Sequence, residues 1–462
     1  MNQNTMKITA IVVVIVVIVA GVAAFFVMNK GSGSSADIDA ALEVYGNADN
    51  DYKIDNADKK VIQNIIDGKE GYTLTKYPLA DANYDGKVTD ADLEVVDAIL
   101  KGKSTTVYHL NYSTDTATYP SGSYVVDTKW PITKTIGNGA ANALIMYKLV
   151  NINPVENVVG INYSKSSPPD SIIWPDYAAM PSLGTSTNYI TEDLLVDCLE
   201  KNPGTSAVIT ADNKNYLNGS TGLSEKEIEE KYGLDVIRVR HAAVDPDEYC
   251  SGLLLLGFLF QKDSEAIKVS EWTTETYKDI AKKTSTVTDK VRASASAYYT
   301  YMSAKNSDYS DNLVQAGATI TTWEQSSSAI YFDRSNAKFD PRIYEDQYQG
   351  DVIVVFRTGS GFLKASWYDD PSSWDVATMQ DHLQHFSEFK AYENKQVWHT
   401  SGDMPIVARV IYSAAILYPD LFSMEDADKL HQEFVDKFLG GIYDVSKLKF
   451  VLSQADIEGM TA

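Results

Sequence analysis

The sequence predicts an α/β protein whose two lobes are joined by one long helix, preceded by a small all-α module and an apolar N-terminal segment. Residues 262–305 contain no Gly or Pro, and their apolar residues recur at steps of three, four or seven, as on one helix face. Strand–loop–helix patterns of similar size lie on both sides of this stretch, with strands expected at 155–161, 207–210, 234–239, 297–302 and 351–356. Residues 224–227 fit a capping box, and further helices are expected at 340–346 and as a final pair near the C-terminus. We expect a clamp with a first lobe at 123–261, a connecting helix at 262–293 and a second lobe at 294–462.

The N-terminal segment predicts a membrane anchor. Residues 8–28 carry no charge, and a helix of this length spans the ~30 Å hydrocarbon layer of a bilayer. The run is longer than the apolar core of a cleaved signal peptide, and it ends in bulky residues. We expect an uncleaved single-pass anchor with the soluble domains outside the cell, and cleavage is the alternative. Residues 31–35 are Gly and Ser, so 1–35 form an anchor and a flexible tether.

Composition excludes several classes of function. The net charge of -23 argues against nucleic-acid binding, which needs clustered Lys and Arg. The apolar fraction of 44% is ordinary for a globular protein with a core. Cys198 and Cys250 are the only cysteines, and both lie in apolar contexts that favour buried free thiols over a disulfide. Two cysteines are too few for an iron–sulfur cluster or a four-thiolate zinc site.

Residues 81–92 match the calcium loop of an EF-hand. Oxygen-bearing side chains fall at loop positions 1, 3, 5, 9 and 12, and Gly86 stands at position 6, where the loop turns sharply. Position 12 is Asp in place of the usual Glu. A hard cation needs six to eight oxygens, which this loop supplies. The predicted calcium ligands are Asp81, Asn83, Asp85, Lys87, Thr89 and Asp92, with Lys87 at the position that contributes a main-chain carbonyl.

A weaker copy of this loop begins 34 residues earlier. It has Asn at position 1 and Tyr52 in place of the glycine. Its predicted ligands are Asn47, Asp49, Asp51, Lys53, Asp55 and Asp58. Two loop–helix units at this spacing resemble a type I dockerin module over 36–103. The resemblance implies that calcium folds the module and that a cohesin-like scaffold is its partner. The alternative is an acidic turn–helix repeat without metal. Residues 104–122 predict a linker or short edge strands.

Four stretches in order carry a second resemblance. They are VENVVGI (155–161), TEDLLVDCLEKNPGTSAVIT (191–210), the long helix, and VIYSAAILYPDLF (410–422) followed by HQEFVDKFLGG. They resemble the substrate-binding proteins of ABC importers of the helical-backbone class, which deliver iron–siderophores, haem and cobalamin. The resemblance covers about 123–441 and implies a periplasmic-binding-protein-like clamp, with the ligand touched by loops at the carboxyl ends of the strands.

The resemblance also implies site residues. Aromatic faces would stack on a flat chelate and an Arg would bind its negative charge. The predicted ligand-binding residues are Asn138, Tyr163, Trp174, Asp212 and His241 in the first lobe, and Trp323, Arg357 and His399 in the second. Family members also dock on the permease through an acidic residue of each lobe. Glu192 or Asp193 falls near the matching place in the first lobe, and Glu345 is the nearest acid in the second, where the matching position is shifted.

The sequence offers no enzyme site. Residues 358–361 lack the spacing of a nucleophile elbow, and His382 and His385 have no carboxylate signature, so we expect them on a solvated helix face. The sequence therefore predicts a membrane-anchored extracellular receptor of an ABC importer for a metal chelate, with calcium as cofactor and an ABC permease as partner. The alternative is a surface assembly protein that docks to a cohesin-like scaffold. A hydrolase carried by the dockerin-like module ranks third.

Overall fold

The computed structural model describes residues 38–153, 156–162, 172, 175, 180–184, 189–213, 215–219, 222–325 and 329–461. The anchor predicted over 8–28 lies outside the described residues, as do the site candidates Tyr163 and Trp174. In the part of the chain that the structure describes, no helix is both long and apolar enough to cross a membrane. The chain divides into two compact units, and the division falls within one helix, between Glu271 and Trp272.

A parallel four-stranded sheet forms the centre of the first unit, in the order β4-β3-β5-β6. The strands are β3 (Lys134–Gly137), β4 (Val158–Ile161), β5 (Thr205–Ala211) and β6 (Asp235–Val239). All four residues of β4 are buried, which explains its uninterrupted apolar run, because parallel strands are covered on both faces. The strands predicted at 155–161, 207–210 and 234–239 are confirmed within two or three residues at each end.

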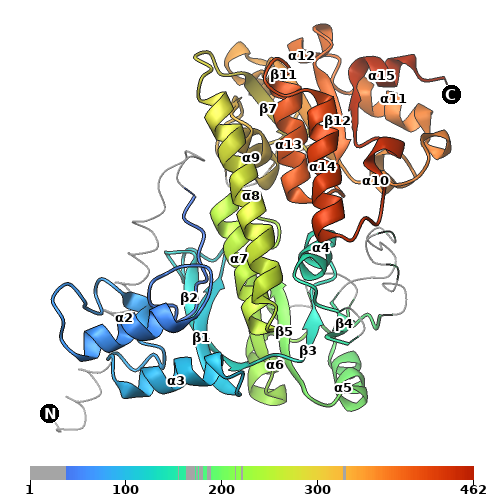
Figure 1. The fold of residues 1–462 in the computed structure, drawn as a ribbon. Coiled ribbons are helices and arrows are strands. Elements are labelled where there is room, and N and C mark those ends of the chain that lie inside the picture. The colour runs from blue at the N-terminus through green and yellow to red at the C-terminus, as the bar shows by residue number, and fades with distance from the viewer. Residues whose placement is uncertain are drawn as a thin grey trace, which may run out of the picture. The chain divides into compact units, whose positions relative to one another are not determined.

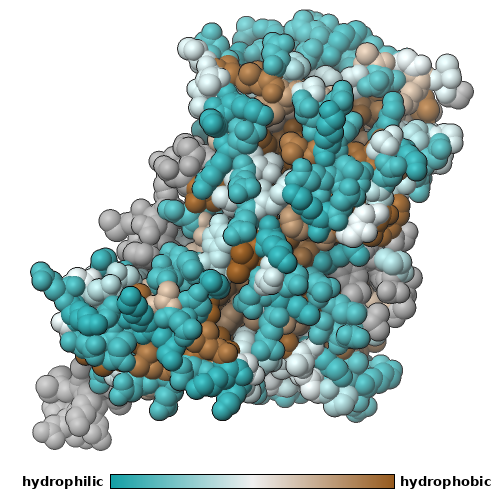
Figure 2. Space-filling view, in the orientation of Figure 1, coloured by the Kyte–Doolittle hydropathy of each residue, from teal (hydrophilic) through white to brown (hydrophobic). Residues whose placement is uncertain are grey.

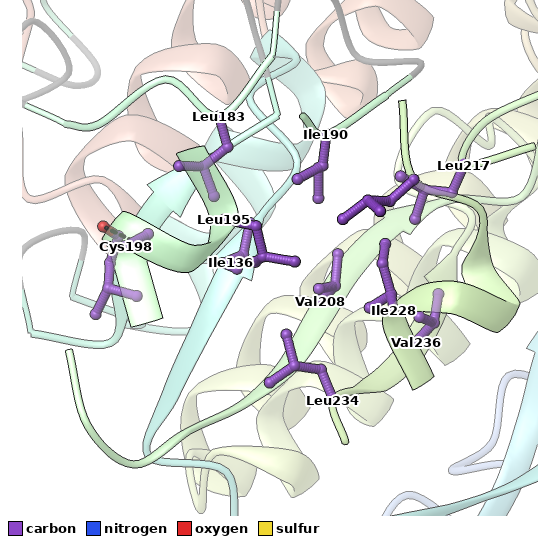
Figure 3. Packing of buried hydrophobic residues seen from close by; sticks show 12 residues of the cluster. Ile136, Leu183, Ile190, Leu195, Cys198, Val208, Leu217, Ile228, Leu234 and Val236 are labelled. Carbon is purple, nitrogen blue, oxygen red and sulfur yellow. Dashed lines mark hydrogen bonds between the residues drawn. The ribbon is translucent and has the colours of Figure 1, made fainter. Parts of the chain in front are cut away.

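Helices cover this sheet and supply most of its core. They are α4 (Ala141–Leu149), α5 (Glu192–Lys201), α6 (Glu225–Tyr232) and α7 (Pro246–Leu259). The predicted capping box begins α6, since Ser224 Oγ accepts from the Glu227 amide at 3.2 Å while the Glu227 carboxylate accepts from the Ser224 amide at 2.8 Å. Leu195 of α5 and Ile228 of α6 gather with Val208 of β5 in one buried cluster (Figure 3). Cys198 and Cys250 are buried free thiols, as predicted.

The segment before the first sheet departs from the predicted module and linker. It contains α2 (Asn56–Ile66), the 3-10 turn η1 (Pro78–Ala80) and α3 (Asp90–Leu100). Of the two alternatives for 104–122, a linker or short edge strands, the structure has a strand: β1 (Thr105–Tyr112) pairs with β2 (Ser123–Trp130) in an antiparallel ribbon. The Tyr45 amide donates to the Tyr108 carbonyl at 2.8 Å, which ties the segment to the ribbon. Figure 1 shows α2 and α3 beside β1 and β2, so residues 38–103 are an integral part of the first unit.

The long helix is shorter than the sequence predicts. Helix α8 runs from Asp263 to Thr284, and β7 (Arg292–Ser296) begins before the predicted helix end at 293. The Thr284 and Thr286 hydroxyls donate to the carbonyls three residues earlier, at 3.4 and 2.7 Å, in competition with the helix ladder. The strand predicted at 297–302 is wrong in its bounds. Residues 292–296 form β7, and Tyr301–Ser303 form the short strand β8.

A five-stranded sheet forms the centre of the second unit, in the order β13-β12-β11-β7-β9. Its further strands are β9 (Thr319–Ile320), β11 (Val352–Arg357), β12 (Val397–Ser401) and the antiparallel edge strand β13 (Val451–Ser453). Strand β10 (Ala329–Tyr331) pairs with β8 outside this sheet. Every residue of β11 is buried, as its apolar run predicts.

Helices pack around the second sheet. They are α9 (Asp308–Gln315), α10 (Gly359–Phe362), α11 (Val376–Gln384), α12 (Lys390–Glu393), α13 (Ile406–Leu417), α14 (Met424–Phe438) and α15 (Gln454–Gly459). Four 3-10 turns complete it: η3 (Pro341–Tyr344), η4 (Asp346–Tyr348), η5 (Pro371–Ser373) and η6 (Val445–Lys447). The predicted C-terminal helix pair is confirmed: α13 is buried throughout and α14 lies beside it (Figure 1).

The acidic composition shows on the surface. Most of the face in Figure 2 is hydrophilic, and hydrophobic residues show in the region of α2 and α3. Leu100, the last residue of α3, is 38% exposed.

Candidate functional site

The carboxyl ends of β7 and β11 meet at one edge of the second sheet, because the two strands are parallel. Arg357 ends β11, and its side chain is turned back into the protein with only 5% of the residue exposed. Its two terminal nitrogens donate to the carbonyls of Ala297 and Gly361, both at 3.0 Å. Its Nε is buried and has no hydrogen-bond partner. The guanidinium is therefore fixed in place by the main chain, with one donor still unused.

Arg357 lies among tyrosine rings and away from acids. Its Cζ is 4.4 Å from the ring centroid of Tyr298 and 5.9 Å from that of Tyr299. Burial lowers the pKa of Arg357, and the nearby titratable side chains that act against this shift are the phenols of Tyr298, Tyr301, Tyr299 and Tyr309. No carboxylate of the described residues forms an ion pair with it. A buried cation without a counter-charge is costly, which makes this position ready to receive an anion.

We call Arg357 with Tyr298, Tyr299, Tyr301 and Tyr309 the tyrosine–arginine cluster. The Tyr298 ring stacks on that of Tyr299 at 4.7 Å and lies parallel to that of Tyr301 at 5.9 Å. Tyr298 is 39% exposed and Tyr309 36% exposed, which is unusual for such large rings in contact with a buried charge. The cluster offers flat apolar faces and phenol hydroxyls to the solvent above a fixed positive charge.

A histidine adjoins the cluster. His382 of α11 stacks on the Tyr299 ring at 4.1 Å and is only 6% exposed. Burial and the nearby charge of Arg357 lower the pKa of His382 to about 4, so the ring is neutral at pH 7. Its Nδ1 is buried without a hydrogen-bond partner. The expected solvated helix face is therefore wrong for His382, whereas His385 remains partly exposed next to Tyr299.

The other two residues predicted in the second lobe lie outside the cluster. His399 is fully buried, and its ring stacks on Phe362 at 4.5 Å and 4°. This placement is in the core, and among the described residues neither ring nitrogen of His399 has a hydrogen-bond partner. Contact between His399 and a ligand stays a prediction. Trp323 is partly exposed, but the Arg342 guanidinium lies 4.7 Å from its ring and Tyr348 contacts it edge-on at 4.6 Å.

In the first unit the predicted residues stand at strand ends but serve mainly to hold the fold. Asn138 is fully buried, and its Oδ1 accepts from the Ala140 amide at 2.8 Å, just before α4. Asp212 faces Arg240 at 3.8 Å, and Arg240 also binds Glu248. Burial raises the pKa of Asp212 despite this partner. His241 is 6% exposed, and burial lowers its pKa to about 4.

The predicted docking acids lie on the surface. Glu192 begins α5, where its carboxylate accepts from Lys231 and, at 2.6 Å, from the Tyr232 hydroxyl. Asp193 is exposed beside it. Glu345 is also exposed, but it stands between η3 and η4 and not on the predicted helix, and it accepts from Gln347 at 2.9 Å.

The two acidic loops share one hydrogen-bond scheme. In each loop the last carboxylate, Asp58 or Asp92, accepts from the amides of loop positions 3 and 9 at 2.6 to 3.2 Å. Position 4 is left-handed in both loops, with φ 58° at Asn50 and 55° at Tyr84. The sequence duplication is therefore a structural duplication as well, even where the residue types differ.

The loops differ at positions 1 and 6. Gly86 has φ +90°, and its amide donates to Asp81 at 2.8 Å; burial raises the pKa of Asp81 to about 6. In the first loop, Asn47 is fully buried and donates to the carbonyls of Leu42 and Asp51, while its Oδ1 accepts nothing. That orphaned oxygen fits a hard cation. Across the described residues, however, no three His, Cys, Asp or Glu side chains are grouped as metal ligands.

Sequence comparisons identify no family. No model of a known protein family matches the chain, and no curated protein matches it. Solved structures do match. The TroA-like periplasmic binding protein FepB from Veillonella parvula is 16% identical, with a TM-score of 0.54 over 72% of this chain and 97% of that one. A periplasmic solute binding protein from Veillonella parvula DSM 2008 is 14% identical, with a TM-score of 0.49 over 73% and 94%. The first likeness shows that this chain has the α/β two-lobed fold of periplasmic binding proteins.

Sequence reasoning found Arg357 but missed the tyrosines around it. Residues 297–302 were interpreted as a strand, whereas Tyr298 and Tyr299 follow β7 at the sheet edge. The signal was present: three of these tyrosines lie within four residues, directly after the strand that pairs with β11. Tyrosines concentrated at a strand end are better explained by an aromatic surface than by a buried strand.

Proposed function

We propose that the protein is the substrate-binding component of an ABC importer for an iron–siderophore or a related metal chelate, such as haem or cobalamin. The observation that carries this proposal is the tyrosine–arginine cluster, where the buried guanidinium has no carboxylate partner among the described residues and is flanked by partly exposed rings. A flat anionic chelate would supply a negative charge that pairs with Arg357 and a flat face that stacks on the tyrosine rings. The protein is a receptor and performs no chemistry on its ligand.

The fold supports the receptor proposal without naming the ligand. The periplasmic binding protein FepB matches over 97% of its own length, so the likeness extends over nearly all of that protein. In such a receptor the ligand would meet loops at strand ends, which is where Arg357 and Tyr298 stand. The metal chelate is the cargo, and the charge of the Arg357 guanidinium would attract its anionic groups.

Delivery requires a permease and a place at the membrane. We place the soluble domains outside the cell, with residues 8–28 as a single-pass anchor. Glu192, Asp193 and Glu345 are the docking acids in this proposal, since all three are exposed and carry charges that basic residues of a permease would bind.

Binding of metal chelates to the full chain tests this proposal. The chain would be offered a panel of ferric siderophores, haem and cobalamin, and its thermal unfolding would be followed. A ligand at about a hundred times its Kd adds roughly 2.7 kcal/mol to the free energy of unfolding, which raises the Tm by several degrees. If no member of the panel shifts the Tm, the ligand class is wrong.

The acidic loops favour a second proposal, in which the loops bind calcium and the chain docks to a cohesin-like scaffold. Its support is the shared hydrogen-bond scheme and the orphaned Oδ1 of Asn47, an oxygen at the position where a calcium loop begins. Calcium would neutralise the buried carboxylates of Asp58 and Asp81, each of which has a raised pKa. Terbium luminescence of the full chain, sensitised by Tyr84 and displaced by calcium, tests this point.

A further inference from the structure

Arg357 gives the tyrosine–arginine cluster a positive charge, but its nitrogens are mostly engaged or buried. Each terminal nitrogen donates to a main-chain carbonyl, that of Ala297 or Gly361, and Nε is buried. With only 5% of the residue exposed, Arg357 acts on a ligand mainly through its charge. An anionic oxygen is held most firmly where such a charge acts together with an N–H group at hydrogen-bond distance.

His382 of α11 has a ring nitrogen in the right place for such a donor. Its ring stacks on that of Tyr299, with 4.1 Å between centroids and 23° between planes. Nδ1 is buried and has no hydrogen-bond partner. Nε2 is not among the buried atoms without a partner, and it hydrogen-bonds to none of the described residues. The exposed 6% of His382 therefore includes Nε2.

The surroundings of His382 keep its ring neutral at pH 7. Burial and the positive charge of Arg357 act in the same direction and lower the pKa of His382 to about 4. The other titratable groups that act on the ring are Asp381 and His385 of α11 and Lys364 after α10, and only Asp381 opposes the shift. A neutral imidazole carries a single N–H, on either Nδ1 or Nε2.

The proton of this neutral ring belongs on Nε2. On Nδ1 it would be a buried donor with no acceptor, close to the positive guanidinium of Arg357, and orphaned buried N–H groups are rare in folded proteins. On Nε2 the N–H meets water or a ligand. The exposed edge of His382 is then a neutral hydrogen-bond donor beside the ring of Tyr299.

We propose that His382 is a ligand-binding residue, which donates a hydrogen bond from Nε2 to an anionic oxygen of the chelate. This role rests on the proposed function, since the chelate must lie against the tyrosine–arginine cluster. Its flat face stacks on the tyrosines, Arg357 attracts its charge, and His382 fixes the position of one peripheral oxygen. The ligands that suit this site are therefore chelates with carboxylate or catecholate oxygens at their edge.

The protonation state of His382 can be measured without any ligand. Long-range ¹H–¹⁵N correlation spectra of the full chain with ¹⁵N-labelled histidine show which ring nitrogen carries the proton. His382→Gln assigns the signals of this ring among the six histidines by their loss. At pH 7 we expect a neutral ring with its N–H on Nε2. An N–H on Nδ1, or a doubly protonated ring, would overturn the role of His382 whatever the ligand is.

Titration with a ferric tris-catecholate, followed by quenching of protein fluorescence, tests the donor itself. His382→Phe keeps a ring that can stack on Tyr299 but has no donor, so it should weaken binding about ten- to a hundredfold. His382→Gln brings an amide N–H near the position of Nε2 and should restore the affinity to within about fivefold of the unmodified chain. His385→Phe, on the same helix and also beside Tyr299, is the matched control and should change the affinity less than about twofold.

The two kinds of failure are distinct. No binding of the tris-catecholate by the unmodified chain would overturn both this ligand class and the contact with His382. If the unmodified chain binds, two results would overturn the role of His382 alone. They are an affinity of His382→Phe within about twofold of the unmodified chain, or equal weakening by His382→Phe and His385→Phe.

Discussion

At the scale of single residues, the account depends on the charge of Arg357. Two carbonyls hold the guanidinium, and within the part of the chain that the structure describes no carboxylate pairs with this buried cation. Such a charge lowers stability and is retained only where it serves binding or specificity. Binding of an anion would offset the free-energy cost of burying the charge of Arg357.

The substitution Arg357→Gln should therefore change the affinity for the ligand and the free energy of unfolding in different ways. We expect the affinity for an anionic ferric chelate to fall by about ten- to a hundredfold, the equivalent of one or two hydrogen bonds to a charged group. The free energy of unfolding should stay the same or rise, because a buried charge is removed. Fluorescence titration and chemical unfolding measure the two quantities. Arg334→Gln, at an exposed arginine bound to Glu388, is the control and should leave the affinity unchanged.

Buried histidines make stability depend on pH. His431 is fully buried between the Tyr412 and Tyr443 hydroxyls, and burial lowers its pKa to about 3. Its unfolded pKa is near 6.5, so between about pH 6.5 and 3 the unfolded chain binds a proton that the folded chain does not. The free energy of unfolding should fall as the pH drops through this window. His109 and His241, with pKa values lowered to about 4, act in the same direction.

His431→Gln tests the assignment. Between pH 6 and 4 the slope of unfolding free energy against pH should decrease by up to about 1.4 kcal/mol per pH unit, the contribution of one proton. An identical pH profile for His431→Gln and the unmodified chain would show that His431 is not the neutral buried group described.

At the scale of elements, local sequence patterns predicted whether a segment forms a helix or a strand better than they predicted where it begins and ends. The capping residues at Ser224 and the apolar run of β11 depend on neighbours in sequence, and both are confirmed. The end of α8 depends on threonine hydroxyls competing for main-chain carbonyls, which the apolar period does not report. Strand β1 has no apolar alternation to reveal it, because its partner β2 and the segment at Tyr45 bury it from both sides.

The first acidic loop gives a prediction for an element. Asn47→Asp restores the charge at loop position 1, but an aspartate cannot donate to the carbonyls of Leu42 and Asp51 as Asn47 does. Without calcium the variant should lose roughly 1–3 kcal/mol of unfolding free energy, the cost of unpaired buried groups. With calcium, the gain in Tm should exceed that of the unmodified chain. Equal stability of both chains in a chelator would contradict this account of the loop.

At the scale of the whole molecule, the sequence predicted a two-lobed α/β receptor from its repeated strand–helix units and from four stretches that occur in the same order as in the family it resembles. It could not indicate which strand-end residues turn inward. His399 lies within β12 and Arg357 ends β11, yet the His399 ring packs in the core against Phe362 while Arg357 is flanked by tyrosines. That choice depends on packing between segments more than thirty-five residues apart, which no local pattern records.

Charge selectivity is the most direct test of the central claim, that the tyrosine–arginine cluster holds an anionic metal chelate. The full chain would be titrated with an anionic ferric chelate and with a neutral ferric chelate of similar size, and quenching of protein fluorescence would be followed. We expect the anionic chelate to bind at least about tenfold more tightly, and Arg357→Gln to abolish that preference. Equal affinity for both chelates, or a preference that survives Arg357→Gln, would contradict the account.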